Sequence, residues 1–382
     1  MIRRVCVITG TRADYGILAP VMKAIRGEPG LELQIVATCM HMMDEFGRTV
    51  DLIEQEGFQV TETLDVSYDS DSPLAQARSV GQALTGLAGC FERLDPAIVL
   101  VLGDRGEMLA GATAANYLRV AVAHIHGGEV SGHIDGVLRH AITKLSHLHF
   151  CATAAARQRI LDLGEEPWRV LLTGAPALDR ILRADYAARE ELESRYGLDG
   201  RRPLIVVLQH PVSTQVEQAA AQMEATLEAV LACEVPAWII YPNADAGGRA
   251  MIEVIRRHED RPLITTFKNI RHRDYLGLLR AAAVLVGNSS SGIIEAPSFG
   301  LPVVNVGSRQ QGRERAGNVI DAPHDAAAIA GAIRKALYDS TFRAGAAVRE
   351  NPYGNGAASE AIVRALKTVT CDSTLLDKRI TY

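Results

Sequence analysis

The sequence lacks the features that mark secreted, membrane-spanning and nucleic-acid-binding proteins. None of its apolar runs reaches the roughly 18 residues of a membrane span. The apolar stretch at the amino end is too short for a signal peptide and is interrupted by Gly10. The net charge is −5 and no basic tract occurs, so the chain offers no positive field to nucleic acid. We therefore expect a cytoplasmic protein with no nucleic-acid partner and no membrane partner.

Closely spaced cysteines are also missing. We expect free, buried thiols in a reducing compartment rather than disulfides, since no CxxC pair occurs. The six cysteines are scattered along the chain: Cys6, Cys39, Cys90, Cys151, Cys233 and Cys371.

Two common nucleotide-binding signatures are absent. No GxGxxG fingerprint and no GxxxxGK(S/T) loop occurs in the sequence. A single HxH pair, His124 and His126, could suggest a metal, but neighbouring glycines and acids favour acid–base chemistry over a compact zinc site. We therefore predict an enzyme with no cofactor and no metal.

The length and the order of apolar segments predict two α/β domains. A chain of 382 residues exceeds what one core usually supports. Short β-branched runs alternate with longer helical patterns, as in parallel sheets covered on both faces, and the series restarts after a charged, helical stretch at Asp179–Asp199. In the first series we predict strands at Val5–Thr9, Leu33–Thr38, Ile98–Leu102, Val120–His124, Leu148–Cys151 and Val170–Thr173, and helices at Ala19–Arg26, Asp44–Glu56, Ser79–Leu94 and Gly106–Leu118. In the second we predict strands at Leu204–Leu208, Ala237–Tyr241, Leu263–Thr266, Val284–Val286 and Val303–Val306.

Ligands of open parallel sheets bind beyond the carboxyl ends of the strands. In the first domain, Arg12 follows the first strand in a glycine-bounded turn and could reach an anion, although a plain strand–helix turn explains the segment almost as well. Asp104 and Arg105 follow the Ile98–Leu102 strand, with a helix N-terminal acid as the alternative. Two glycines and Glu129 follow His126, and the segment continues to Asp135 and Arg139.

In the second domain, a serine-rich turn at Gly287–Pro297 follows a strand and leads into a helix. Backbone N–H groups, hydroxyls and the helix dipole would suit a diphosphate, while an ordinary helix cap is the alternative. Glu295 cannot bind phosphate, but its oxygens would suit a ribose or sugar hydroxyl. His210 and Asn243 end two strands, and Arg309 and Arg313 follow a later one.

Taken together, these motifs resemble the hydrolysing UDP-N-acetylglucosamine 2-epimerases of the sialic and legionaminic acid pathways. GTRADYG, GDR, HIHGGEVSG, RHAITKLSH, QHP, GNSSSGIIEAP, GSRQQGRERAGNVI and NPYGNGAAS occur in that family's order, from about Arg3 to about Val369. The non-hydrolysing enzymes carry a GTRPE-type opening, whereas this chain has Arg12-Ala13-Asp14. The family often has a second acid after the position of Asp135, where this chain has Gly136.

The resemblance implies the GT-B architecture: two Rossmann-like, doubly wound domains with the substrate in the cleft between them. It implies that a C-terminal helix at about Ala357–Val369 returns to the first domain. The domains would then be residues 1–178 with 357–382, and residues 179–356. A UDP-sugar as substrate and a homodimer or homotetramer are implied as well.

The same resemblance assigns roles to individual residues. Acid–base work would fall to Asp104, Glu129 and Asp135, with His126 or His210 assisting the hydration step. Contacts to uridine and diphosphate would involve Arg12, Arg105, His210, Asn243, Ser289, Ser290, Glu295 and Arg309. The predicted substrate-binding set also includes Asp14, His41, Arg139, Gly292 and Arg313.

Chemistry restricts the mechanism. Carbon 2 of an N-acetylglucosaminyl group has no acidic proton, and oxidation beside it would need a nicotinamide for which no fingerprint is present. We therefore expect elimination of UDP to a 2-acetamidoglucal, then hydration with inversion at carbon 2 to give N-acetylmannosamine. The alternatives are a UDP-2,4-diacetamido-trideoxy sugar or a GDP-sugar as substrate, a non-hydrolysing epimerase, a GT-B glycosyltransferase and a non-catalytic sugar-nucleotide sensor.

Overall fold

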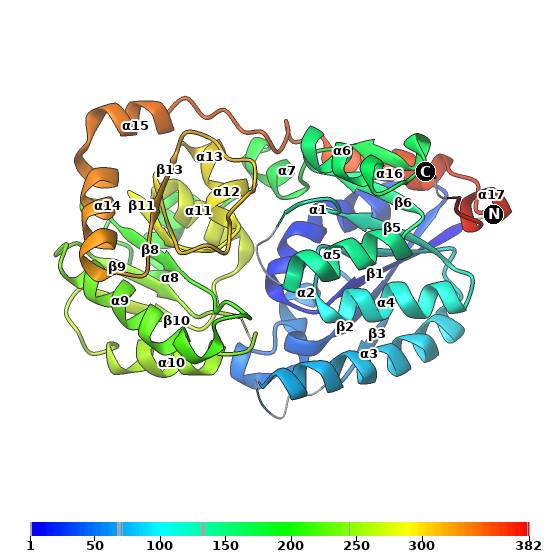
Figure 1. Cartoon of the computed structure of the whole chain (residues 1–382), viewed down its shortest axis with the longest axis horizontal. Helices are drawn as coiled ribbons and strands as arrows, with labels where there is room; N and C mark the ends of the chain where they lie inside the picture. The colour runs from blue at the N-terminus through cyan, green and yellow to red at the C-terminus, as the bar shows by residue number, and fades with distance from the viewer. Residues whose placement is uncertain are drawn as a thin grey trace. The chain divides into compact units, whose positions relative to one another are not determined.

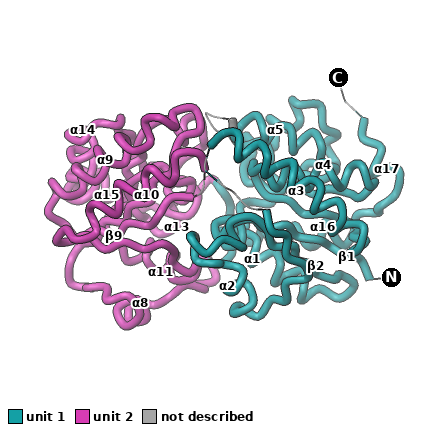
Figure 2. Tube along the Cα trace, turned by 90° about the horizontal axis from the view of Figure 1, so that it is seen from below, with its two compact units in different colours: residues 1–130, 134–180, 353–382 teal, residues 131–133, 181–352 magenta. Residues whose placement is uncertain are grey.

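The computed structural model describes residues 2–66, 70, 72–130, 134–243, 245–379 and 381. The chain forms two compact units, drawn in different colours in Figure 2. Unit 1 contains Met1–Val130, Ile134–Arg180 and Tyr353–Tyr382, and unit 2 contains Ile181–Pro352. The chain therefore leaves unit 1 after Arg180 and returns to it at Tyr353.

Unit 1 is built on a seven-stranded sheet in the order β3-β2-β1-β4-β5-β6-β7, with parallel pairing throughout. Helices cover both faces of this sheet (Figure 1), which explains why its central strands are continuous apolar runs. The strands are β1 (Arg3–Thr9), β2 (Leu31–Thr38), β3 (Glu62–Leu64), β4 (Ile98–Leu102), β5 (Ala121–Ile125), β6 (Leu148–Cys151) and β7 (Val170–Leu172). The helices are α1 (Arg12–Gly27), α2 (Val50–Gln55), α3 (Pro73–Leu94), α4 (Gly106–Tyr117), α5 (Ile134–Leu145), α6 (Ala154–Asp162), α7 (Ala177–Leu182), α16 (Ala358–Thr368) and α17 (Ser373–Leu376), with 3-10 turns η1 (Cys39–Met42), η2 (Asp44–Phe46) and η3 (Pro167–Arg169).

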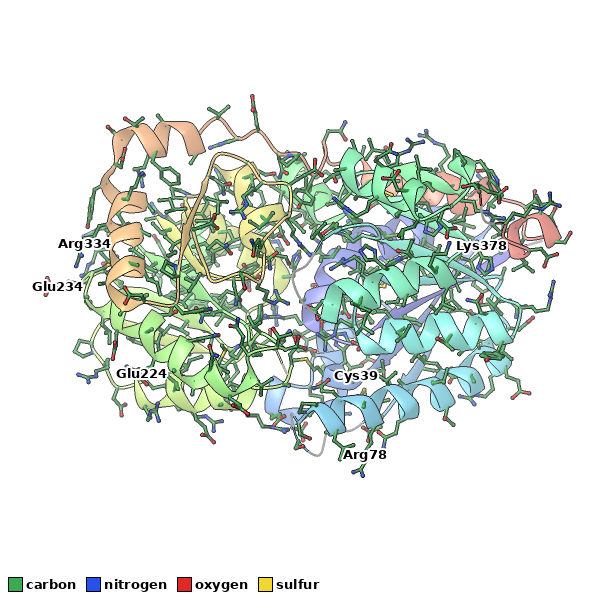
Figure 3. The ribbon with its side chains drawn as sticks, in the orientation of Figure 1. Cys39, Arg78, Glu224, Glu234, Arg334 and Lys378 are labelled. Carbon is green, nitrogen blue, oxygen red and sulfur yellow. The ribbon has the colours of Figure 1, made fainter. Side chains whose placement is uncertain are left out.

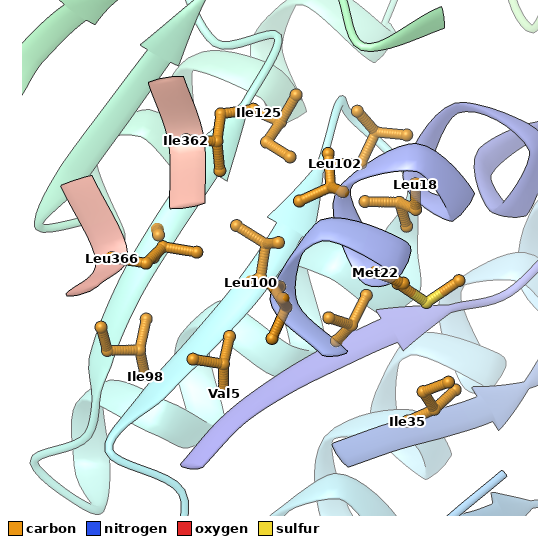
Figure 4. Packing of buried hydrophobic residues seen from close by; sticks show 14 of the residues in the cluster. Val5, Leu18, Met22, Ile35, Ile98, Leu100, Leu102, Ile125, Ile362 and Leu366 are labelled. Carbon is orange, nitrogen blue, oxygen red and sulfur yellow. The ribbon is translucent and has the colours of Figure 1, made fainter. Parts of the chain in front are cut away.

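The alternation of side chains along β1 divides the core of unit 1 between two layers. Val5 and Val7 pack with α1 and α16 on one face, while Cys6 and Ile8 pack with α3 and α4 on the other. Figure 4 shows the first layer, where Ile362 and Leu366 of α16 lie among strand and α1 side chains. The C-terminal helix is thus part of the core of unit 1.

Further contacts hold the returning segment. Asp179 accepts hydrogen bonds from the backbone N–H groups of Ala358 (3.1 Å) and Ser359 (2.7 Å) at the start of α16. Near the carboxyl end, the Nζ of Lys378 (labelled in Figure 3) donates to the carbonyls of Lys144 (2.9 Å) and Ser146 (2.6 Å). These bonds satisfy backbone groups that would otherwise be buried alone.

Unit 2 repeats the architecture with a six-stranded parallel sheet in the order β10-β9-β8-β11-β12-β13. Its strands are β8 (Ile205–Leu208), β9 (Ala237–Ile240), β10 (Ile264–Phe267), β11 (Val284–Gly287), β12 (Val303–Val306) and β13 (Val319–Ala322). Its helices are α8 (Arg189–Tyr196), α9 (Ala219–Leu231), α10 (Gly248–Arg257), α11 (His272–Ala281), α12 (Ser291–Ile294), α13 (Ala296–Phe299), α14 (Ala326–Tyr338) and α15 (Ser340–Ala346), with the 3-10 turn η4 (Val216–Gln218). Two doubly wound α/β units are the fold class predicted from the sequence, which is confirmed.

Several local predictions are wrong. The helix predicted at Asp44–Glu56 is divided into η2 and α2, because Gly47 and Arg48 adopt positive φ angles of 87° and 41°. The stretch Asp179–Asp199 is helical only in part: it holds the end of α7 and all of α8, with residues 183–188 between them. The edge strands β3 and β13 were not predicted. All six cysteines are free, but Cys371 is exposed and Cys233 is half-buried, against the expectation of buried thiols.

Candidate functional site

Each sheet has a switch point, where the strand order reverses and the turns after two adjacent strands diverge. In unit 1 the chain runs outward through β1, β2 and β3 and then returns beside β1 as β4. In unit 2 the switch point lies between β8 and β11. Most of the predicted site residues follow the strands at or next to these two points.

The turn after β1 is organised by Asp14. Its carboxylate accepts hydrogen bonds from the Thr9 hydroxyl (2.7 Å) and from the backbone N–H groups of Gly10 (3.0 Å) and Thr11 (3.0 Å). The Thr11 hydroxyl in turn accepts from the Asp14 N–H, which completes a capping box at the start of α1. Burial raises the pKa of Asp14, although these bonds and nearby Arg105 act in the opposite direction. In the structure Asp14 holds this turn, and its predicted contact with substrate stays a prediction.

His41 supports the same turn from the end of β2. Its Nε2 lies 2.9 Å from the Thr9 hydroxyl, and its Nδ1 lies 2.8 Å from the Thr49 hydroxyl. Because Thr9 donates its only hydroxyl proton to Asp14, Nε2 of His41 must be the donor to Thr9. Burial lowers the pKa of His41 to about 4, so the ring is neutral at pH 7. A substrate contact by His41 also stays a prediction.

Arg139 of α5 joins the ends of β4 and β5. One Nη donates to the Asp104 carboxylate, and the other donates to the His126 carbonyl at 2.9 Å. Arg139 is only 3% exposed, whereas the Asp104 side chain retains 21% exposure. Asp135 lies in the first turn of α5, four residues before Arg139 and on the same helix face. The structure therefore groups Asp104, Asp135 and Arg139 around the start of α5.

A carboxylate–imidazole pair follows β5. His126 Nδ1 lies 2.6 Å from Glu129 Oε1, and both side chains are almost completely buried. Since an ionised carboxylate only accepts, Nδ1 carries the proton, and in the neutral ring Nε2 keeps its lone pair. This buried Nε2 has no hydrogen-bond partner among the described residues. The arrangement is that of a general base held by a carboxylate.

The backbone around this pair is unusual. His126 has a φ of 62°, which is uncommon for a residue with a side chain and occurs often at functional sites. Gly128 has a φ of 76°, and a Cβ there would overlap the Ala156 carbonyl. Glycine is therefore required for the HGGE turn to pack against α6.

In unit 2, Asn288 connects the two turns at the switch point. Its Oδ1 accepts from the His210 backbone N–H (2.7 Å), and its Nδ2 donates to the His210 carbonyl (2.9 Å). Asn288 is fully buried, and the sequence-based site set omits it because no pattern separates a bridging amide from an ordinary turn residue. Its preceding residue, Gly287, has a φ of 132° and lies where a Cβ would overlap the Leu208 carbonyl.

His210 also receives a hydrogen bond on its ring. The backbone N–H of Asn243, which follows β9, donates to His210 Nδ1 at 3.2 Å. This bond requires a lone pair on Nδ1, so the ring proton lies on Nε2 and that nitrogen is a donor. The structure thus brings His210, Asn243 and the Gly287–Ser291 turn together.

The serine-rich turn follows a strand and leads into a helix, as predicted. The helix after it is short, since α12 ends at Ile294 and Pro297 lacks the N–H needed to continue it regularly. The N–H groups of residues 291–294 all donate to Ser289 or Ser290 within the turn. Ser291 is buried and accepts from the Tyr275 hydroxyl at 2.7 Å. The backbone N–H groups of these four residues are therefore used within the turn, and phosphate contacts by Ser289 and Ser290 stay predictions.

Arg309 lies beside the same turn. Its Nη1 is 3.4 Å from the Asn288 carbonyl, which also accepts from the Gln310 side chain at 2.8 Å. Glu295 is buried, with 6% exposure, at the junction of α12 and α13. Gly292 packs against the sheet, since a Cβ there would lie 2.8 Å from Val303 Cγ1. For the other predicted substrate residues, the structure places Arg12 at the start of α1, Arg105 before α4 and Arg313 after Gln310, and their ligand contacts stay predictions.

Two features are absent from the described residues. In that part of the chain, no group of three or more His, Cys, Asp and Glu side chains could hold a metal ion. No helix in the described ranges is long and apolar enough to cross a membrane.

The sequence matches a family model described as UDP-N-acetylglucosamine 2-epimerase over residues 23–367. A UDP-N,N'-diacetylbacillosamine 2-epimerase (hydrolyzing) of Legionella pneumophila is 39% identical, over 100% of both chains. A UDP-N-acetylglucosamine 2-epimerase of Neisseria meningitidis is 35% identical, over 90% of this chain and 89% of that one. A GDP/UDP-N,N'-diacetylbacillosamine 2-epimerase (hydrolyzing) of Campylobacter jejuni is 33% identical, over 84% of each.

Among solved structures, the UDP-GlcNAc 2-epimerase of Neisseria meningitidis bound to UDP-GlcNAc superposes with a TM-score of 0.79. The match covers 95% of this chain and 99% of that chain at 19% identity, so it supports the fold alone. It confirms the predicted GT-B-type pair of Rossmann-like domains, and the sequence matches confirm the family resemblance.

Proposed function

Since the chain belongs to the UDP-N-acetylglucosamine 2-epimerase family, we propose that it is a hydrolysing 2-epimerase acting on UDP-N,N'-diacetylbacillosamine. The observation that carries the proposal is the 39% identity to the Legionella enzyme, which extends over the whole of both chains. The motifs alone favoured N-acetylglucosamine as the sugar, with the 2,4-diacetamido-trideoxy sugar as an alternative. The relatives support the alternative better, and the Neisseria relative keeps UDP-N-acetylglucosamine as the second candidate.

The switch point of unit 2 suits the nucleotide diphosphate. His210 offers an Nε2–H donor whose orientation is set by Asn243 and Asn288. Arg309 adds a cation beside the same turn. Both groups would stabilise the negative charge that grows on the diphosphate as the sugar–phosphate bond breaks. The backbone N–H groups of residues 291–294 are used within their own turn, so the proposal rests on these two side chains together with Ser289 and Ser290.

The switch point of unit 1 supplies acid–base groups. In the first step a base takes the proton from carbon 2, the C2–H electron pair forms a carbon 1–carbon 2 double bond, and the carbon 1–oxygen pair leaves with UDP. We assign this base to His126 Nε2, with Glu129 holding the ring on the other side. In the second step water adds its hydroxyl to carbon 1, and a proton is delivered to the opposite face of carbon 2. Asp104 and Asp135, near the start of α5, are the candidates for that proton transfer.

Substrate identity can be tested with purified protein and a panel of sugar nucleotides. The panel contains UDP-N,N'-diacetylbacillosamine, its GDP analogue, UDP-N-acetylglucosamine and UDP-glucose, and nucleotide release is followed without any acceptor sugar. We expect the highest kcat/KM for UDP-N,N'-diacetylbacillosamine and no release from UDP-glucose, which lacks the 2-acetamido group. A higher kcat/KM for UDP-N-acetylglucosamine would favour the second candidate. Release only after an acceptor is added would point to a glycosyltransferase instead.

A further inference from the structure

Glu107 is a buried acid that the predicted set of site residues does not include. It lies in the first turn of α4, and its side chain is 2% exposed. Surface carboxylates at helix N-termini are common, but a carboxylate is seldom buried without a specific partner. Here the partner is Arg105, whose Nε donates to Glu107 Oε1 at 2.8 Å.

The Glu107 carboxylate also occupies the space above the turn after β1. A Cβ added at Gly10 would overlap its carboxyl group. Gly10 is not among the residues with positive φ, so its backbone does not require glycine. The three atoms nearest to such a Cβ all belong to the Glu107 side chain, so a side chain at Gly10 would displace Glu107 where the turns after β1 and β4 meet.

We propose that Glu107 is a positioning residue, which fixes the Arg105 guanidinium at the switch point of unit 1 for binding the anionic sugar nucleotide. This inference rests on the proposed function for the identity of the ligand. An arginine side chain loses considerable rotamer freedom when it binds. Because Glu107 accepts a hydrogen bond from Arg105 Nε, the arginine side chain is already restricted before the ligand binds. The opposite edge of its planar guanidinium group is directed away from Glu107. Gly10 maintains the arrangement by leaving room for the carboxylate.

The test compares Glu107→Gln with the wild type and with a matched control. Gln keeps the size of Glu but loses the charge that holds Arg105. We expect KM for the preferred sugar nucleotide, and Kd for UDP, to rise about tenfold, with kcat changing less than about threefold, where tenfold corresponds to roughly 1.4 kcal/mol. The control is Glu165→Gln, another buried glutamate of unit 1, paired with Lys144 at 2.7 Å, which should lower Tm and leave KM unchanged.

A double-mutant cycle tests the fit with Gly10 separately, through Tm and UDP affinity. In the wild-type background, Gly10→Ala should weaken UDP binding as much as Glu107→Gln does. In a Glu107→Ala background, where the space beside Gly10 is empty, Gly10→Ala should change Tm and UDP affinity little. Gly10→Ala effects that are equal in both backgrounds would overturn the proposed fit.

The outcomes distinguish this inference from the proposed function. If the wild type turns over a sugar nucleotide and Glu107→Gln has the wild-type KM, the positioning role is wrong and the proposed function stands. If the wild type neither binds UDP nor releases it from any sugar nucleotide, both are wrong. If Glu107→Asp, which keeps the charge, recovers part of the affinity lost in Glu107→Gln, the positioning role is supported.

Discussion

The carboxylate of Glu129 gives the most direct perturbation of the acid–base machinery. Glu129→Gln keeps an oxygen that can accept the proton on His126 Nδ1, so the ring orientation should survive. What is lost is the negative charge, which stabilises the imidazolium formed when Nε2 takes a proton. Both side chains are nearly buried and their contact is 2.6 Å, so water can replace little of this interaction.

The expected size follows from this geometry. A hydrogen bond to a charged group contributes about 1.5–3 kcal/mol, and each 1.36 kcal/mol of barrier is about tenfold in rate. We therefore expect kcat of Glu129→Gln to fall roughly 10- to 150-fold, with KM changed by less than about threefold. His126→Asn removes the base itself and should lower kcat by about 10²–10⁴-fold.

The assay is single-turnover release of UDP with enzyme in excess, which reports the chemical step rather than product release. Glu165→Gln is again the matched control, because Glu165 also pairs with a buried histidine, His149, at 3.3 Å. Glu165 follows α6, where the chain returns to the amino ends of the strands, so it lies at the end of the sheet opposite the predicted site residues. It should lower Tm and leave the single-turnover rate unchanged. A Glu129→Gln rate within threefold of the wild type would refute the assignment of His126 and Glu129 as the base pair.

Three further predictions concern stability. Burial lowers the pKa of His41 to about 4, of His124 to about 3 and of His147 to about 4, so between pH 8 and pH 5 only the unfolded state takes up protons at these histidines. The free energy of unfolding should therefore decrease by about 2 kcal/mol for each histidine when the pH is lowered from 8 to 5, and equal urea midpoints at the two pH values would contradict this. Gly128→Ala should lower the free energy of unfolding in urea by about 2–3 kcal/mol, because the new Cβ combines a positive φ with a clash. Gly57→Ala, with a φ of 82° and open space around it, should lower it by only about 1 kcal/mol, and similar losses for both variants would show that the clash is relieved. Lys378→Met should cost about 1–3 kcal/mol, because two carbonyls lose their donor and Glu165 loses one of its partners while keeping Lys144. Lys367→Met, at an exposed pair with Glu28, should cost less than about 1 kcal/mol, and a loss for Lys378→Met as small as that of this control would contradict the buried network.

The central strands could be predicted from the sequence because both of their faces are buried. The run Ile98–Leu102 predicts β4 with the bounds observed, since each of its residues is apolar and buried. The edge strand β3 has three partly exposed residues, Glu62–Leu64, and carries no such signal. The predicted helix begins at Ala19, whereas α1 begins at Arg12, because the capping residues Thr11 and Asp14 lie in the glycine-bounded turn expected to bind an anion.

The site could be predicted only at the level of position. The rule that ligands bind beyond strand ends selects turns that the structure places at or next to the two switch points, and the family motifs supply the residue types. The sequence could not show which polar groups already satisfy one another, as Arg139 does for Asp104 and Asn288 does for His210. Such pairings join segments far apart in the chain, and they depend on packing rather than on spacing.

The most direct test of the central claim is incubation with UDP-N,N'-diacetylbacillosamine in deuterium oxide, followed by NMR of the products. Elimination followed by hydration predicts free UDP and a free 2,4-diacetamido-trideoxy sugar that is inverted at carbon 2 and carries deuterium there. A released sugar that keeps its original proton at carbon 2, or no release of UDP at all, would contradict the account.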